Sequence, residues 1–113
     1  MTDGKLSAIV AGPDEDGLAD ALEAEAVGVT RLDGLATRPA LEEAGICSAD
    51  LFVLTDVSQA TSIPIARDLT DDLRTVVFAR DTVPEFVRGQ LDLAIDPRLV
   101  EVSVVANELA AKE

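Results

Sequence analysis

Short apolar runs alternate with segments of helical pattern along the whole chain, and this alternation limits the possible folds more than any other feature. The five runs occupy residues 5–11, 29–33, 50–56, 74–79 and 91–95. Between the first two, Leu18, Ala21 and Leu22 have the i, i+3, i+4 spacing of one helix face. Strands that alternate with helices form βαβ units. We therefore predict a single domain over residues 1–113, an α/β three-layer sandwich with helices on both faces of a five-stranded parallel sheet.

Residues that favour helix ends mark several boundaries. Gly28 is expected to end the first helix. Thr37 is expected to cap a helix that has Pro39 in its first turn and Gly45 beyond its end. A further short helix is predicted over residues 83–89, since this segment also opens with a proline and closes with a glycine.

Two prolines locate the remaining helix starts. Pro64 fits a helix only if that helix begins near Ser62, because a proline deeper inside would remove a backbone hydrogen bond. Asp96 followed by Pro97 is typical of a cap and a first helical position. We therefore predict that the last helix begins there and runs to the C-terminus.

The last helix carries one apolar stripe and one apolar residue outside it. Val102, Val105, Ala106 and Leu109 form the stripe, which core packing explains. Val104 points away from the stripe, and its exposure would indicate a homodimer surface.

The charge of the chain excludes one class of partner. Acidic residues outnumber basic ones 22 to 9, for a net charge of -13. Nucleic-acid binding is not expected, because the phosphate backbone requires a basic face. A solvated acidic surface adapted to high salt, as in a halophile, accounts for this charge better than an acidic functional surface.

The absence of histidine excludes several catalytic sites. A Ser-His-Asp triad, a Cys-His pair and the usual zinc sites all require it. The single cysteine, Cys47, cannot form an internal disulfide, and no leader or long apolar run is present. We expect a cytoplasmic protein without membrane insertion, and without enzymatic activity.

The candidate site lies where the strands end, because parallel α/β folds bind ligands at the carboxyl ends of their strands. These ends are residues 12–17, 55–58, 80–82 and Asp96. The first contains Asp14, Glu15 and Asp16 at the start of a helix. Carboxylates there can satisfy the free backbone N–H groups in place of a phosphate, so we expect a self-capped loop, with a working anion site as the alternative.

The stretch from Gly34 to the last helix resembles the RCK family, the TrkA-type Rossmann domains that regulate potassium channels and transporters. The matching stretches are "GLATRPALEEAGICSADLFVLTD", "VVFARDTVPEF" and "DLAIDPRLV". The resemblance implies a Rossmann-like fold from which one strand-helix unit is missing. The simplest repair of that gap gives the flavodoxin-like strand order 2-1-3-4-5.

The RCK resemblance also implies a nucleotide site, in a weakened form. Gly12, Thr55, Asp56 and Arg80 occupy binding positions of that family, while Gly17 completes a Gly-x-x-x-x-Gly loop that lacks the middle glycine. An adenine nucleotide would lie across these residues and Asp14, with K+ or Mg2+ offsetting the acids. The favoured function is a nucleotide-sensing or protein-interaction module.

A second resemblance, to response-regulator receiver domains, implies a different chemistry. Those domains use acids after their first and third strands to hold Mg2+ and accept phosphate. Asp14, Asp16 and Asp56 resemble that trio, and carboxylate oxygens suit Mg2+. The family's lysine after the fifth strand is Asp96 here. The alternative function is therefore a Mg2+-binding, receiver-like or phosphoryl-transfer domain.

A third resemblance concerns Cys47. The letters "GICSA" are similar to the nucleophile elbow of class I glutamine amidotransferases, and the chain is similar to small haloarchaeal proteins labelled CTP synthetase-like. An elbow requires a strand before the nucleophile and a helix after it, whereas this chain has the reverse order. We therefore interpret Cys47 as a buried, small apolar residue at a helix-to-strand turn.

Overall fold

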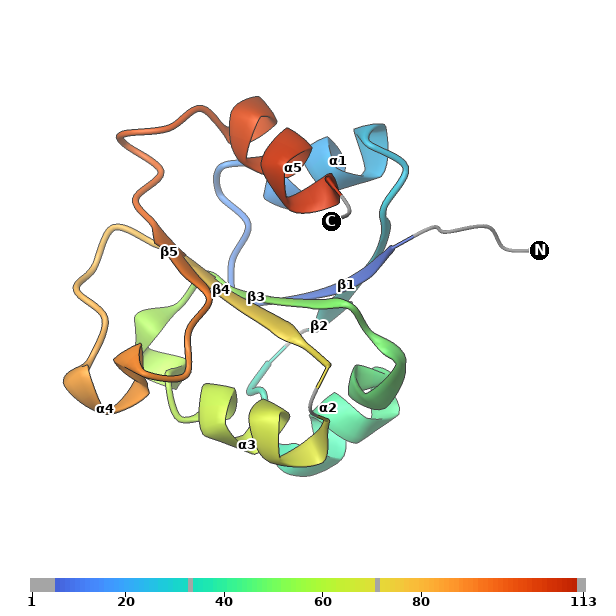
Figure 1. Ribbon diagram of the computed structural model, residues 1–113, viewed down its shortest axis with the longest axis vertical. Coiled ribbons are helices and arrows are strands. Elements are labelled where there is room, and N and C mark those ends of the chain that lie inside the picture. Colours follow the sequence, from blue (N-terminus) through green and yellow to red (C-terminus); the bar gives the residue numbers. More distant parts are fainter. Residues whose placement is uncertain (1–5, 33, 71, 112–113) are drawn as a thin grey trace.

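Five parallel strands form one sheet in the order β2-β1-β3-β4-β5 in the computed structural model, which describes residues 6–32, 34–70 and 72–111 (Figure 1). This order confirms the predicted fold class. The strands are β1 (Ser7–Ala11), β2 (Gly28–Leu32), β3 (Leu51–Leu54), β4 (Arg74–Phe78) and β5 (Leu93–Ile95). The helices are α1 (Leu18–Ala24), α2 (Arg38–Glu43), α3 (Ser62–Leu69), α4 (Glu85–Arg88) and α5 (Val102–Ala110), with single 3-10 turns η1 (Ile46–Ser48) and η2 (Val57–Gln59).

The sheet is buried on both faces, so its central strands are apolar without interruption. In β1, Ala8 and Val10 contact the core under α1 and α5, while Ile9 faces the core above α2 and α3. Every residue of β3 is buried in the same alternating way. Figure 1 shows α1 and α5 on one side of the sheet and α2, α3 and α4 on the other.

Two predicted helix starts are confirmed. The Thr37 hydroxyl accepts a hydrogen bond from the Ala40 N–H at 3.3 Å, and Gly45 follows α2 with a φ of 88°. Helix α3 begins at Ser62, which leaves Pro64 in its first turn. Local capping chemistry thus determined these boundaries.

The predicted role of Gly28 is wrong. Helix α1 ends at Ala24, and Ala26 takes the left-handed conformation with a φ of 67°. The Ala26 and Val27 N–H groups then bond back to the carbonyls of Glu23 and Leu22. Because the chain has already turned, Gly28 is the first residue of β2. Asp33, the predicted end of that strand, lies outside the described residues.

The predicted start of the last helix is also wrong. Helix α5 begins at Val102, after Glu101, and residues 97–99 form a turn. Asp96 closes this turn by accepting a hydrogen bond from the Arg98 N–H at 2.9 Å, so its carboxylate does not cap a helix. Within α5 the predicted stripe is confirmed, since Val105, Ala106 and Leu109 are buried. The expected exposure of Val104 is confirmed at 53%.

Candidate functional site

The loops that follow β1, β3, β4 and β5 meet at the carboxyl edge of the sheet, where the site was predicted. A cavity of about 190 Å³ lies there, lined in part by Asp14, Asp16, Thr55 and Arg80. This volume is below the roughly 300 to 1,000 Å³ of typical small-molecule sites. Asp14, Glu15, Asp16 and Asp81 all line it, so the acids there outnumber the single arginine.

Gly12 makes room for the protein's own side chain. Its φ is 102°, and a Cβ added to it would lie 2.5 Å from the Thr55 Oγ1. The Thr55 hydroxyl fills this space and lies within hydrogen-bonding distance of the Ala11 and Pro13 carbonyls. A nucleotide-binding loop would use the space beside this glycine for the close approach of a phosphate. In this protein the side chain of Thr55, the residue after β3, fills that space.

Asp14 confirms the predicted self-capping of the acidic loop. Its carboxylate accepts hydrogen bonds from the N–H groups of Leu18 at 2.8 Å and Ala19 at 3.0 Å. These are among the N–H groups that a helix start leaves unpaired. Arg31 of β2 lies 3.9 Å from the same carboxylate and donates to the Gly12 carbonyl at 2.8 Å. Glu15 and Asp16 are exposed.

The Asp56 carboxylate bonds to the 3-10 turn that follows it. Its Oδ1 accepts from the Ser58 N–H at 3.0 Å and from the Ser58 hydroxyl at 2.7 Å, and the hydroxyl contact lowers the pKa of the Asp56 carboxyl. Asp56 thereby caps η2. Within residues 6–32, 34–70 and 72–111, no three His, Cys, Asp or Glu side chains are placed to share a metal ion. Asp14, Asp16 and Asp56 therefore do not converge as the predicted Mg2+ site requires.

Asp96 forms an ion pair with Arg98 two residues later. The Arg98 Nη2 lies 2.7 Å from the Asp96 Oδ2, and its Nε donates to Oδ1 at 3.0 Å. These hydrogen bonds lower the pKa of Asp96 from its ordinary 3.8 to about 2. The position at which receiver domains carry a lysine is thus a carboxylate that a neighbouring arginine already neutralises.

Arg80 is the exposed arginine that lines the 190 Å³ cavity, and Arg31 is a second exposed arginine, beside Asp14. Among the described residues Arg80 forms no ion pair within 4.0 Å. The structure therefore brings Arg80, Thr55 and Asp14 to one cavity, while Gly17 starts α1 in a left-handed conformation and Asp56 serves η2. A nucleotide at these residues stays a prediction.

A larger cavity, of about 470 Å³, lies beside β5; the sequence predicts its residues 80–82 and Asp96 as site positions but not its apolar lining. It lies between β4, β5 and the loop leading into α4, and its apolar lining includes Val77, Val83, Leu91 and Ala94. Helix α4 spans a single turn, which is too short to cover the edge of the sheet. The sequence did carry a signal for the short helix, because Pro84 and Gly89, which bound the predicted helix 83–89, are close together.

Cys47 lies at the predicted helix-to-strand turn, but its predicted burial is wrong. It is exposed within η1, and its Sγ lies 3.6 Å from the Leu69 carbonyl oxygen. The adjacent Ile46 points into the core in its place. A single 3-10 turn directs successive side chains to different sides, so only one of the two could be buried.

Comparison with known proteins places the chain in a family. A model described as "Family of unknown function (DUF7126)" matches residues 8–109. The chain belongs to this family. No curated protein sequence matches it. The RCK resemblance is untested by these comparisons and stays a prediction.

Solved structures similar to this DUF7126 protein share its fold. A response regulator from Thermotoga maritima has a TM-score of 0.69 and 13% identity, over 93% of this chain and 94% of that one. A candidate pilus assembly-related protein from Burkholderia pseudomallei has a TM-score of 0.62 and 18% identity, over 99% and 96%. A candidate pilus assembly protein from Burkholderia thailandensis has a TM-score of 0.63 and 17% identity, over 95% and 99%. The fold is therefore flavodoxin-like and receiver-like. In the described residues, no helix has the length and apolarity needed to cross a membrane.

Proposed function

We propose that this DUF7126 protein is a receiver-like module that binds another protein and carries out no phosphoryl transfer. The receiver-like alternative predicted from the sequence thus applies to its architecture, without its Mg2+ chemistry. The fold supports the first part of the proposal, and the bonding of the acids at the carboxyl edge supports the second.

The observation that carries the proposal is the bonding of Asp14. Both of its carboxylate oxygens accept backbone hydrogen bonds at the start of α1, and its side chain is only 10% exposed. A divalent cation would have to compete with these bonds, and losing them would leave two N–H groups unpaired. Asp14 therefore serves α1 at the place where a receiver domain holds its metal.

The other positions of the edge support the same conclusion. The residue directly after β3 is Thr55, a neutral side chain whose hydroxyl faces backbone carbonyls. After β5, the Asp96 carboxylate is paired with Arg98. Transfer of a phosphoryl group to a carboxylate requires a metal and a free cation to neutralise the developing charge. Neither Thr55 nor Asp96 can supply that neutralisation, and Arg80, the unpaired arginine of the cavity, has no metal site beside it among the described residues.

Exposed apolar side chains support a role in protein binding. Among the described residues, five large hydrophobic side chains are exposed: Leu35, Phe86, Leu99, Val100 and Val104. Four of these five lie in the last third of the chain, on or beside α4 and α5. Leu99 and Val100 are neighbours in the loop before α5, and adjacent exposed apolar residues mark interaction sites more often than scattered ones do.

The experiment is an attempt to phosphorylate the protein with acetyl phosphate and Mg2+ in molar KCl, read by intact mass. We expect no added phosphoryl group, and no Mg2+-dependent shift in the NMR signals of residues 14, 16 and 56. The Asp56→Asn variant is the matched control. A phosphoryl group that appears only with Mg2+, and disappears in Asp56→Asn, would contradict the proposal in favour of phosphoryl transfer.

A thermal-shift screen with adenine nucleotides tests the sensing function predicted from the sequence. A ligand that binds only the folded state raises the apparent melting temperature. Because the 190 Å³ cavity is small and mostly acidic, we expect no shift. A shift that Arg80→Ala abolishes would show instead that this cavity opens to admit a nucleotide.

A further inference from the structure

We infer that the edge of the sheet formed by β5 is the surface on which a second copy of this chain binds. The β5 edge face consists of β5 itself, the loop 97–101 with Leu99 and Val100, and the 470 Å³ cavity beside α4. The inference rests on the proposed function, because it names the partner of the proposed interaction module.

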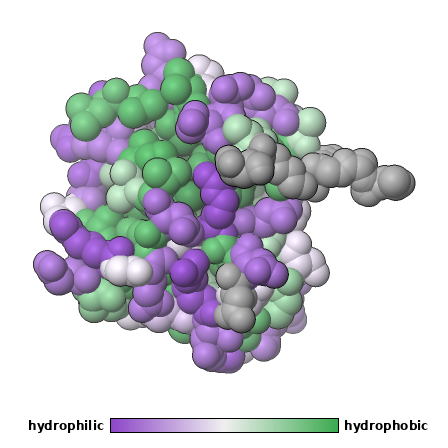
Figure 2. Space-filling view, in the orientation of Figure 1, coloured by the Kyte–Doolittle hydropathy of each residue, from purple (hydrophilic) through white to green (hydrophobic). Residues whose placement is uncertain are grey.

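The β5 edge face carries exposed apolar side chains beside charged ones and is only partly covered. Leu99 is 81% exposed and Val100 is 37% exposed. Leu93 and Ile95 pack on the core beneath α5 but remain half-buried, while Ala94 is exposed on the opposite face of the sheet. Figure 2 shows hydrophobic surface over the loop after β5 and along the strand, interrupted by hydrophilic residues. A partner would therefore cover apolar area from the loop to the cavity.

The shape of this face follows from the shortness of α4. In register, Ala94 stands beside Val77, whose side chain belongs to the core on the α3 side. Val77 is already buried, but the single turn of α4 leaves Ala94 exposed, with the 470 Å³ cavity over it. Strand β5 also pairs only with β4 among the described strands, so its outer edge is unpaired. Such an edge is a template for association with another chain.

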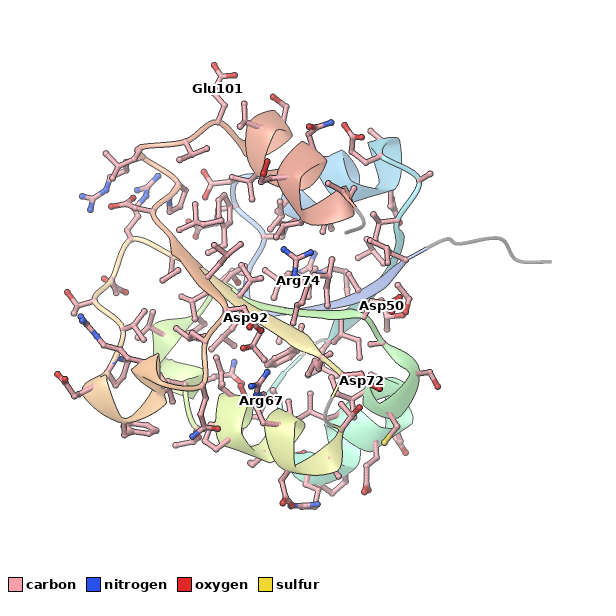
Figure 3. The ribbon with its side chains drawn as sticks, viewed as in Figure 1. Asp50, Arg67, Asp72, Arg74, Asp92 and Glu101 are labelled. Atoms are coloured by element: carbon pink, nitrogen blue, oxygen red, sulfur yellow. The ribbon has the colours of Figure 1, made fainter. Side chains whose placement is uncertain are left out.

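The charge of the same segment singles it out from the rest of the chain. Residues 74–101 contain four arginines and five acids, so their net charge is only -1, whereas the whole chain carries -13. The arginines are Arg74, Arg80, Arg88 and Arg98, and the acids are Asp81, Glu85, Asp92, Asp96 and Glu101. Figure 3 shows Arg74 and Asp92 on this side of the molecule, with Arg67, whose Nη1 lies 3.6 Å from the Asp92 Oδ2.

This balance of charge favours a second copy over other occupants. Two chains of charge -13 repel each other least when their nearly neutral segments meet. A strongly acidic partner would meet the five acids of this segment, and a strongly basic one would meet its four arginines. A copy of the segment presents both signs, so an arginine such as Arg80 or Arg88 can approach an acid of the other chain.

A two-fold symmetric dimer also matches the shape of the face, which has both an exposed side chain, Leu99, and a cavity. In an isologous dimer, if patch A of one copy contacts patch B of the other, then patch B of the first copy also contacts patch A of the second. A two-fold axis in the plane of the interface, between Leu99 and the cavity, places Leu99 of each copy over the other copy's cavity. The protruding side chain and the 470 Å³ cavity would then be filled and covered together.

The test is sedimentation velocity over a range of protein concentrations, in molar KCl and in the lowest KCl concentration at which circular dichroism shows the chain folded. We expect a monomer-dimer equilibrium with a Kd of about 10 µM or tighter in molar salt, within the range of standard interfaces. The dimer should weaken at the lower salt concentration, because the repulsion between the two acidic chains is then less screened. A chain that stays monomeric at every concentration and both salts would overturn the inference.

Two variants and one matched control locate the surface. Leu99→Asp should weaken dimerisation at least about tenfold. Ala94→Arg should do the same through the cavity, which guards against a merely local effect of the first change. Leu35→Asp makes an identical change at a leucine that is 70% exposed outside this face, and it should leave the Kd unchanged. Equal effects of Leu99→Asp and Leu35→Asp would overturn the inference.

The dimerisation test and the phosphorylation test contradict different claims. A chain that stays monomeric and takes no phosphoryl group would contradict the inferred dimer and leave the proposed function intact. A dimer that is phosphorylated with Mg2+ would instead remove the proposed function. Circular dichroism of each variant confirms that the compared proteins are folded.

Discussion

Replacing Asp14 with alanine tests the central structural claim, that the acidic loop satisfies the start of α1. The change removes an acceptor from two backbone N–H groups, which the Asp14 oxygens hold at 2.8 and 3.0 Å. Loss of a helix cap costs about 0.5 to 2 kcal/mol, and a hydrogen bond to a charged group is worth about 1.5 to 3 kcal/mol. Because the side chain is only 10% exposed, water replaces these bonds poorly. We expect a loss of about 2 kcal/mol in the free energy of unfolding.

The loss should appear as a lower melting temperature in circular dichroism at a fixed, molar KCl concentration. For a domain of this size, about 2 kcal/mol corresponds to roughly 8 °C. Asp14→Asn keeps one acceptor oxygen, so we expect it to lose about half as much stability. Asp16→Ala is the matched control, since it removes the same charge from an exposed side chain of the same loop.

The comparison between the two alanine variants decides the question. Removing either carboxylate relieves some repulsion in a chain of charge -13, so both variants receive that benefit. Only Asp14→Ala also loses the cap. If the two variants melt at the same temperature, the hydrogen bonds to the Leu18 and Ala19 N–H groups contribute nothing, and the reasoning is refuted.

Three further predictions concern Gly12, Asp96 and salt. Gly12→Ala should destabilise the fold by about 2 kcal/mol or more, because its φ of 102° strains an alanine and the new Cβ meets Thr55; Gly89→Ala, with a φ of -72° and nothing within 4 Å, should be nearly neutral in urea unfolding. The lowered pKa of Asp96 means that its contact with Arg98 stabilises the fold above about pH 4 and is lost as pH falls through about 2. In an NMR titration, Arg98→Gln should return that pKa toward about 3.9, and an unmoved pKa would contradict the assignment. Circular dichroism should show loss of folded structure in millimolar KCl, as expected of a halophile's acidic chain; unchanged spectra would remove that interpretation.

The sequence alone determined the features that depend on neighbours along the chain. The alternation of apolar runs and helical segments was enough to predict a parallel sheet with helices on both faces. Caps and breakers such as Thr37 and Pro64 located α2 and α3, because the bonds they make or forbid lie within one turn. The self-capping by Asp14 and the exposure of Val104 follow from the same short-range geometry.

The tertiary structure decided the features that depend on contacts between distant segments. Thr55 fills the space left by Gly12 because β1 and β3, separated by an entire strand-helix unit, lie side by side. The Asp56 carboxylate caps its own 3-10 turn and does not join Asp14 and Asp16 in a metal site. The path of the chain after β3 decides this bonding. The cavity beside β5 exists because α4 is too short to span the edge strand, and no local pattern reports how far a helix must reach. Short-range bonds set the elements of this protein, whereas the packing of distant strands and loops set which side chains remain free to act.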